Sequence, residues 1–129
     1  MNRQAIEQEI QDKGLTAPRV TLEDIEANIT SEYFFTAETG IKGEIEHRGG
    51  VPYSYETPLK LLTFCVLVLR NGFTVTGESA CASPENFDAE LGRKIARENA
   101  ISKVWPLMGY ALKDRLFDNA AKVNKGAQA

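Results

Sequence analysis

The dipeptide Asn71-Gly72 constrains the fold of this chain more than any other feature, because it separates two runs that are rich in β-branched and aromatic residues. Such a dipeptide supplies the two positive φ angles that a two-residue type I′ hairpin turn requires. We therefore predict a β-hairpin over residues 59–80. With a two-residue loop, Val68 lies beside Val75.

The predicted register gives the hairpin two unlike faces, since side chains alternate along a strand. The face assigned to the following helix carries Leu62, Phe64, Val66, Val68, Phe73, Val75 and Gly77. The other face carries Leu61, Cys65, Leu67, Leu69, Thr74, Thr76 and Glu78. A first strand that is apolar on both faces is typical of a strand covered on both faces. Two candidates for the second cover stay open, another copy of the protein and the N-terminal segment.

The predicted helices surround this hairpin and give an α+β fold. Residues 1–20 form an N-terminal helical arm, and Thr21 opens a second helix with the pattern of a capping box. A long helix is predicted over residues 84–105, where Pro106 must stop or kink it. A C-terminal helix follows, and residues 119–129 are expected to form a flexible tail.

Length and composition are those of one soluble domain over residues 1–129, with 43% hydrophobic and 26% charged residues. The longest apolar run is too short to cross a membrane, because Lys60 and Arg70 bracket it. The N-terminus is polar and lacks the pattern of a secretory signal. We therefore expect a cytoplasmic protein with no membrane partner.

Catalytic and metal-binding patterns are missing from the sequence. Cys65 and Cys81 are expected to be free thiols, because their placement suits neither a disulfide framework nor a metal cluster. His47 lies in a glycine-rich stretch, residues 36–57, that we expect to be a long loop or a weak pair of strands. We expect an ordinary surface histidine there. The sequence predicts no enzyme activity, no metal and no cofactor.

The corner between the second strand and the long helix carries side chains suited to an anion. A helix start presents free N–H groups and partial positive charge. Arg93 and Arg97 lie one helical turn apart and would add charge-assisted contacts. Phe87 could stack a base, although its spacing with Leu91 and Ile95 also fits a core stripe. The net charge of −3 argues against general nucleic-acid binding.

The segment NGFTVTGESACASPENFDAELGRKIARENAISKVWPLMGY resembles a widespread family of small phage and prophage proteins. The shared pattern is a Leu-rich strand ending Leu-x-Asn-Gly-Phe, then Gly-x-Ser-Ala-Cys, Asn-Phe, a Gly-x-x-x-Ala helix and Trp-Pro-Leu. It covers residues 59–116 densely and 21–35 more loosely. The same segment resembles the Thoeris anti-defence sponge proteins, which sequester cyclic ADP-ribose isomers made by bacterial immune enzymes. Members also bind cyclic oligonucleotides at a separate site and form homohexamers.

This resemblance implies capture of a cyclic nucleotide without turnover, in the cytoplasm of a bacterial host and between copies of the protein. Met108 departs from the family pattern, which usually has an acid there. The ligand-binding residues expected from the pattern and the resemblance are Asn86, Phe87, Arg93, Arg97, Asn99 and Arg115. The alternative function is a phage interaction protein that binds a host protein through an exposed face of the sheet.

Overall fold

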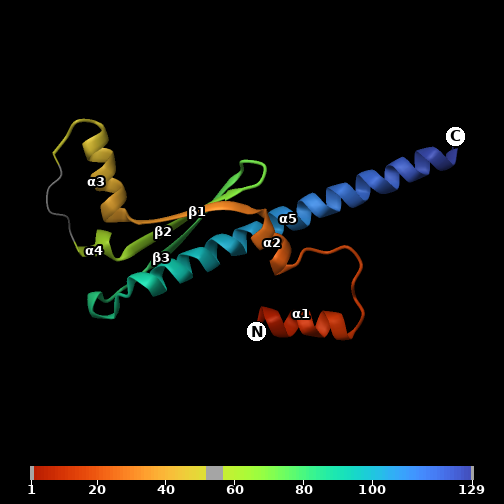
Figure 1. Cartoon of the computed structure of the whole chain (residues 1–129), viewed down its shortest axis with the longest axis horizontal. Helices are drawn as coiled ribbons and strands as arrows, with labels where there is room; N and C mark the ends of the chain where they lie inside the picture. The colour runs from red at the N-terminus through yellow and green to blue at the C-terminus, as the bar shows by residue number, and fades with distance from the viewer. Residues whose placement is uncertain (1, 52–56, 129) are drawn as a thin grey trace. The chain divides into compact units, whose positions relative to one another are not determined.

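The structure is a computed structural model that describes residues 2–51 and 57–128. Its contacts divide the chain into two compact units. We call Asn28–Val104 the sheet unit, and Met1–Ala27 with Trp105–Ala129 the terminal unit. Both units contain helices and the sheet unit contains an antiparallel sheet, so the predicted α+β class is confirmed (Figure 1). A single domain with a flexible arm and tail stays a prediction.

The sheet has three antiparallel strands in the order β1-β2-β3. The strands β2 (Leu62–Leu69) and β3 (Thr74–Ala80) form the predicted hairpin. The strand β1 (Ile29–Thr36), which the sequence patterns did not predict, pairs with the other edge of β2. The central strand β2 therefore gains a hydrogen-bonded neighbour on each side.

The hairpin loop differs from the predicted type I′ turn, and that prediction is wrong. The backbone N–H of Leu69 donates to the Phe73 carbonyl at 2.8 Å, which leaves a three-residue loop. Gly72 has a φ of 89°, and no described residue other than glycine has a positive φ. The Asn71 carboxamide oxygen accepts a hydrogen bond from the Phe73 N–H at 3.0 Å. Three-residue hairpin loops usually have one glycine in the left-handed conformation after a turn. The Asn-Gly dipeptide suits this loop as well as it suits the two-residue type I′ loop.

The changed loop shifts the register by one residue, so Val68 pairs with Thr74 instead of Val75. A shift of one residue moves every side chain of a strand to the other face. The face toward the helix therefore carries Thr63, Cys65, Leu67, Leu69, Val75 and Gly77. The predicted placement of Leu62, Phe64, Val66 and Val68 on that face is wrong, and these half-buried residues share the opposite face.

The helix α5 (Ala89–Gln128) runs along the sheet in its first part (Figure 1). A single turn of 3-10 helix, η1 (Pro84–Asn86), precedes it, so the predicted helix 84–105 is divided near its start. Of the two predicted outcomes at Pro106, a stop is wrong because α5 includes Pro106 and continues, and a kink stays a prediction. Proline removes one backbone donor, and the flanking residues are mostly good helix formers. The helix also includes most of the segment expected as a tail.

Two further helices lie between β1 and β2 in the sequence. The helix α3 (Ala37–His47) replaces the predicted loop or strand pair, which is wrong for these residues. The Thr36 hydroxyl caps it by accepting from the Thr39 N–H at 3.2 Å. The short helix α4 (Thr57–Lys60) leads into β2, and residues 52–56 of the predicted loop lie outside the described residues.

Two N-terminal helices, α1 (Arg3–Asp12) and α2 (Leu22–Asn28), confirm the helices predicted there. The capping box of α2 is present, because the Thr21 N–H donates to the Asp24 carboxylate at 2.9 Å and the Asp24 N–H donates to the Thr21 hydroxyl at 3.1 Å. None of the helices in the described part of the chain has the length and apolar character needed to cross a membrane.

Candidate functional site

The corner between β3 and α5 holds Asn86 and Phe87. Asn86 ends η1 and is exposed, whereas Phe87 is half-buried. A Cβ added at Gly92 would lie 3.8 Å from the Phe87 ring, so Phe87 lies against the first turn of α5. Its position is intermediate between the core and ligand roles that its sequence spacing left open. Part of the ring remains accessible to a stacking partner.

The start of α5 is capped by its own sequence. The Asp88 carboxylate accepts from the Leu91 N–H at 3.0 Å, which satisfies one of the free donors expected there. The side chain of Ser83, the cap expected for the preceding turn, makes no capping hydrogen bond. The helix start therefore offers fewer free N–H donors to an anion than the sequence predicted.

The arginines of the candidate site lie on one ridge of α5, since residues four apart share a helix face. The Arg97 Nε lies 2.7 Å from Glu32 Oε2, so the guanidinium is anchored to β1. Arg93 is exposed one turn earlier and has no hydrogen bond or ion pair to any described residue. The ridge therefore combines one positioned cation with one cation that is available to an anion.

The Glu32–Arg97 ion pair also affects the pKa of the Cys65 thiol in β2. Burial and the negative charge of Glu32 raise the pKa of Cys65, and the positive charge of Arg97 opposes them. Cys65 is fully buried in β2 and its thiol stays protonated near neutral pH. A protonated, buried thiol is a poor nucleophile, so this site has a structural cysteine and not a reactive one.

Asn99 lies on another side of α5, because two residues correspond to a rotation of about 200° along a helix. Its side-chain amide donates to the Glu78 carbonyl in β3 at 2.7 Å. Lys103 lies 3.9 Å from the Glu78 carboxylate on the same side. Asn99 is thus held by the sheet edge opposite to the one that holds Arg97.

The structure therefore brings together only part of the predicted site. Asn86 and Phe87 share the corner, and Arg93 shares a ridge with Arg97. Asn99 faces β3, and Arg115 belongs to the terminal unit. Glu32, the partner of Arg97, could not be found from the sequence, because the two residues are 65 positions apart and no local pattern joins them.

The described residues, 2–51 and 57–128, include no group of three His, Cys, Asp or Glu side chains that could hold a metal ion. Both cysteines are free, and His47 is exposed at the end of α3. The site therefore offers hydrogen-bond donors and one aromatic ring for binding. Its polar contacts are compatible with ligand binding and equally with a structural role.

Comparison with known proteins agrees with the phage-like pattern of the strand and helix. A search of curated proteins and a search of solved structures give no match. The model of the phage protein (N4 Gp49/phage Sf6 gene 66) family matches residues 20–116, which include the whole sheet unit and the first part of α5. The chain therefore belongs to the phage protein (N4 Gp49/phage Sf6 gene 66) family.

Proposed function

We propose that this phage protein is a sponge that binds and sequesters cyclic ADP-ribose isomers made by bacterial immune systems, without cleaving them. The observation that carries the proposal is the ridge of Arg93 and Arg97 on the helix whose first turn lies against the half-buried ring of Phe87. The resemblance of the chain to the Thoeris anti-defence proteins indicates the class of ligand. Cyclic oligonucleotides are a second class that the same resemblance implies.

The chemistry of the ridge suits a ligand that joins a base to a pyrophosphate. Guanidinium groups make charge-assisted, often bidentate contacts with phosphate oxygens. Glu32 holds the Arg97 guanidinium in place, and Arg93 contributes a charge that no described residue neutralises. An aromatic ring can stack a base for about 1–3 kcal/mol, and this is the role proposed for Phe87. Asn86 would add polar contacts at the same corner.

The proposed site is shared between copies of the protein. Arg97 is anchored to β1 and Asn99 to β3, on different sides of α5, so one small ligand does not reach both within one subunit. A neighbouring copy that contributes Asn99 or Arg115 would complete the ring of contacts. We propose a homo-oligomer, and the resemblance implies a hexamer.

Titration of the purified protein with glycocyclic ADP-ribose tests this function. We expect saturable binding by calorimetry and a higher melting temperature, with binding weakened at least about tenfold in Arg93→Ala and in Arg97→Ala. Arg48→Ala is the matched control, because Arg48 is an exposed arginine directly after α3 whose ion pair among the described residues is with Glu44 of that helix.

The variant Glu32→Gln distinguishes the positioning of the Arg97 guanidinium from its charge. This variant keeps the Arg97 cation but replaces the carboxylate that anchors it, so we expect a smaller loss of affinity than in Arg97→Ala. Absence of binding by the wild-type protein to this ligand and to cyclic oligonucleotides would contradict the proposal. Loss of folding in Arg97→Ala would show that the arginine is structural.

A second candidate function is an interaction protein that binds a host protein through the open face of the sheet. Tyr33 is 60% exposed on this face, and Phe35 is 38% exposed and stacks on Phe64 with ring centroids 5.4 Å apart. Exposed aromatic side chains are common at protein interfaces. If this candidate is right, Tyr33→Lys abolishes retention of a stoichiometric host partner, and Arg93→Ala leaves it unchanged.

A further inference from the structure

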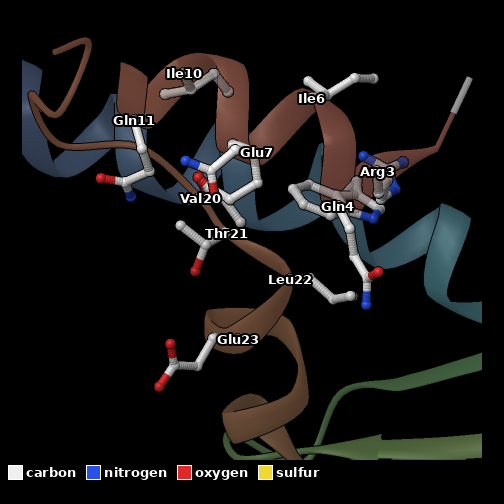
Figure 2. Close-up of a pocket in the computed structure, with 12 residues that line it drawn as sticks. Arg3, Gln4, Ile6, Glu7, Ile10, Gln11, Val20, Thr21, Leu22 and Glu23 are labelled. Atoms are coloured by element: carbon white, nitrogen blue, oxygen red, sulfur yellow. The ribbon is translucent and has the colours of Figure 1, made fainter. Parts of the chain in front are cut away.

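The terminal unit contains a cavity of about 390 Å³, within the range of small-molecule sites. It is lined by α1 and by residues 20–23 at the start of α2 (Figure 2). Trp105 of α5 also lines it. None of the six predicted ligand-binding residues lines it. The inference drawn from this cavity is therefore independent of the proposed sponge function.

The walls of the cavity are largely apolar. The apolar lining consists of Ile6, Ile10, Val20, Leu22 and the indole of Trp105. Figure 2 shows Gln4 and Glu7 extending from α1 toward the segment that carries Val20 and Leu22. No side chain of α1 is fully buried, so this helix leaves apolar surface within reach of a ligand. Such walls suit a ring system.

A positive charge is held at this apolar cavity. The Arg3 guanidinium carbon lies 3.9 Å from the centre of the Trp105 ring, a cation–π arrangement. Arg3 has no hydrogen bond or ion pair to any described residue, so its N–H donors remain available. The buried Trp105 Nε1 also lacks an acceptor among the described residues.

The acidic residues of the cavity leave this cation without a counterion. Glu7 is already paired, because Arg19 Nη2 donates to Glu7 Oε1 at 2.7 Å. The carboxylate of Glu23 points away from α1 in Figure 2. Arg3 is exposed, and a guanidinium makes charge-assisted hydrogen bonds with anionic groups. The charge that Arg3 presents is therefore best matched by a ligand that brings its own negative group.

We propose that this cavity binds a small aromatic anion, meaning a ring system that carries one carboxylate or sulfonate group. The rings lie against the isoleucine, valine and leucine side chains, and the anionic oxygens accept hydrogen bonds from Arg3. An oxygen in that position also offers the acceptor that Trp105 Nε1 lacks. The ligand is recognised by two features together, an apolar ring and a single negative charge.

Two fluorescent probes with the same rings separate these features. The anionic probe is 8-anilinonaphthalene-1-sulfonate, and the neutral one is N-phenyl-1-naphthylamine. Trp105 is the only tryptophan of the chain, so quenching of its emission reports occupancy of this cavity. We expect the wild-type protein to bind the anionic probe at least about fivefold more tightly, because a charge-assisted hydrogen bond to Arg3 is added.

Substitution of Arg3 tests the origin of that preference. In Arg3→Gln the two dissociation constants should agree within about twofold, and Arg3→Lys should keep the preference for the anion. Lys13→Gln is the matched control, because Lys13 follows α1 and pairs with Glu9 outside the cavity. Ile6→Ala should weaken both probes equally, since it removes part of the apolar wall.

Three results would overturn the proposal. They are equal affinity of the two probes for the wild-type protein, an unchanged preference in Arg3→Gln, and unchanged binding of both probes in Ile6→Ala. Circular dichroism shows whether α1 is still formed in each variant. If Arg3→Gln melts α1, the comparison between Arg3→Lys and wild type decides, and loss of the preference in the lysine variant contradicts the proposal.

Discussion

The sheet unit and the terminal unit are stabilised in different ways. In the sheet unit, β3 approaches α5 so closely that Gly77 lies directly against the backbone of Ala96 and Ala100. In the terminal unit, Ile25 is the one described residue that is buried, and α1 is held by polar contacts such as Arg19 with Glu7. Close backbone packing gives a rigid frame, whereas a thin apolar contact leaves room for a ligand.

Replacing Gly77 by Val should have the largest effect of all. A Cβ at this position would collide with backbone atoms of Ala96 and Ala100, which cannot move aside as a flexible side chain does. We expect a loss of at least about 3 kcal/mol in the free energy of unfolding, measured by urea denaturation.

Gly43→Ala is the control for that substitution within the same unit. Gly43 lies inside α3, and a Cβ there meets no atom within 4 Å. We expect this variant to be more stable by about 0.5–1 kcal/mol, because alanine is the better helix former. Similar stabilities for Gly77→Val and wild type would contradict the close packing of β3 on α5.

Ile25→Ala is the matching test of the terminal unit. Ile25 is completely buried, so its truncation removes apolar contacts and leaves a cavity. We expect a loss of about 2–3 kcal/mol in the free energy of unfolding, less than for Gly77→Val. A loss larger than that of Gly77→Val would reverse the comparison between the two units.

Removing the ion pair of the terminal unit should have a smaller effect. Arg19 and Glu7 are both partly exposed, so water and salt screen their attraction. In Arg19→Ala we expect a loss of at most about 1 kcal/mol and more rapid amide exchange in α1. A double-mutant cycle with Glu7→Gln isolates the pair, and a coupling energy near zero would show that α1 is held by its apolar contacts alone.

The smallest expected effect is a pH dependence that comes from Cys65. Its pKa is raised in the folded protein above the ordinary value of 9.0, so the unfolded chain loses this proton first as the pH rises. The contribution of the thiol to stability is complete below about pH 9 and declines above it. We expect the stability of wild type relative to Cys65→Ala to fall as the pH rises above about 9.

Thiol labelling checks the same group independently. Cys81 is half-buried and Cys65 is fully buried, so a thiol reagent should modify Cys81 in the native protein and Cys65 only after unfolding. Rapid native modification of both cysteines would contradict the packing of β2 described here.

The hairpin was predictable because its signal is local. Asn71-Gly72 places the turn correctly, but the same dipeptide serves both a two-residue and a three-residue loop. With the three-residue loop, Cys65 and Leu67 lie on the helix side of β2, whereas the two-residue loop had predicted them on the other side. The choice depends on packing against α5, which no local pattern contains.

Other features were hidden because they depend on contacts between distant residues. The strand β1 lacks clean alternation, and its aromatic residues gain their roles only by pairing with β2. The glycines of α3 made a helix hard to predict from sequence, and a Cβ at Gly40 would lie 3.1 Å from the Phe35 ring, a tight contact with a side chain that belongs to β1. At the candidate site, the corner and the arginine ridge follow from sequence, whereas the Glu32 anchor does not.

The most direct test of the proposed function is mass spectrometry of what the protein releases. Purified protein is incubated with glycocyclic ADP-ribose, separated from free ligand and denatured by heat. The sponge proposal predicts recovery of the intact cyclic molecule in a fixed ratio to the protein, and about tenfold less from Arg93→Ala at limiting ligand. Recovery of a linear product, or of no ligand from the wild-type protein, would contradict it.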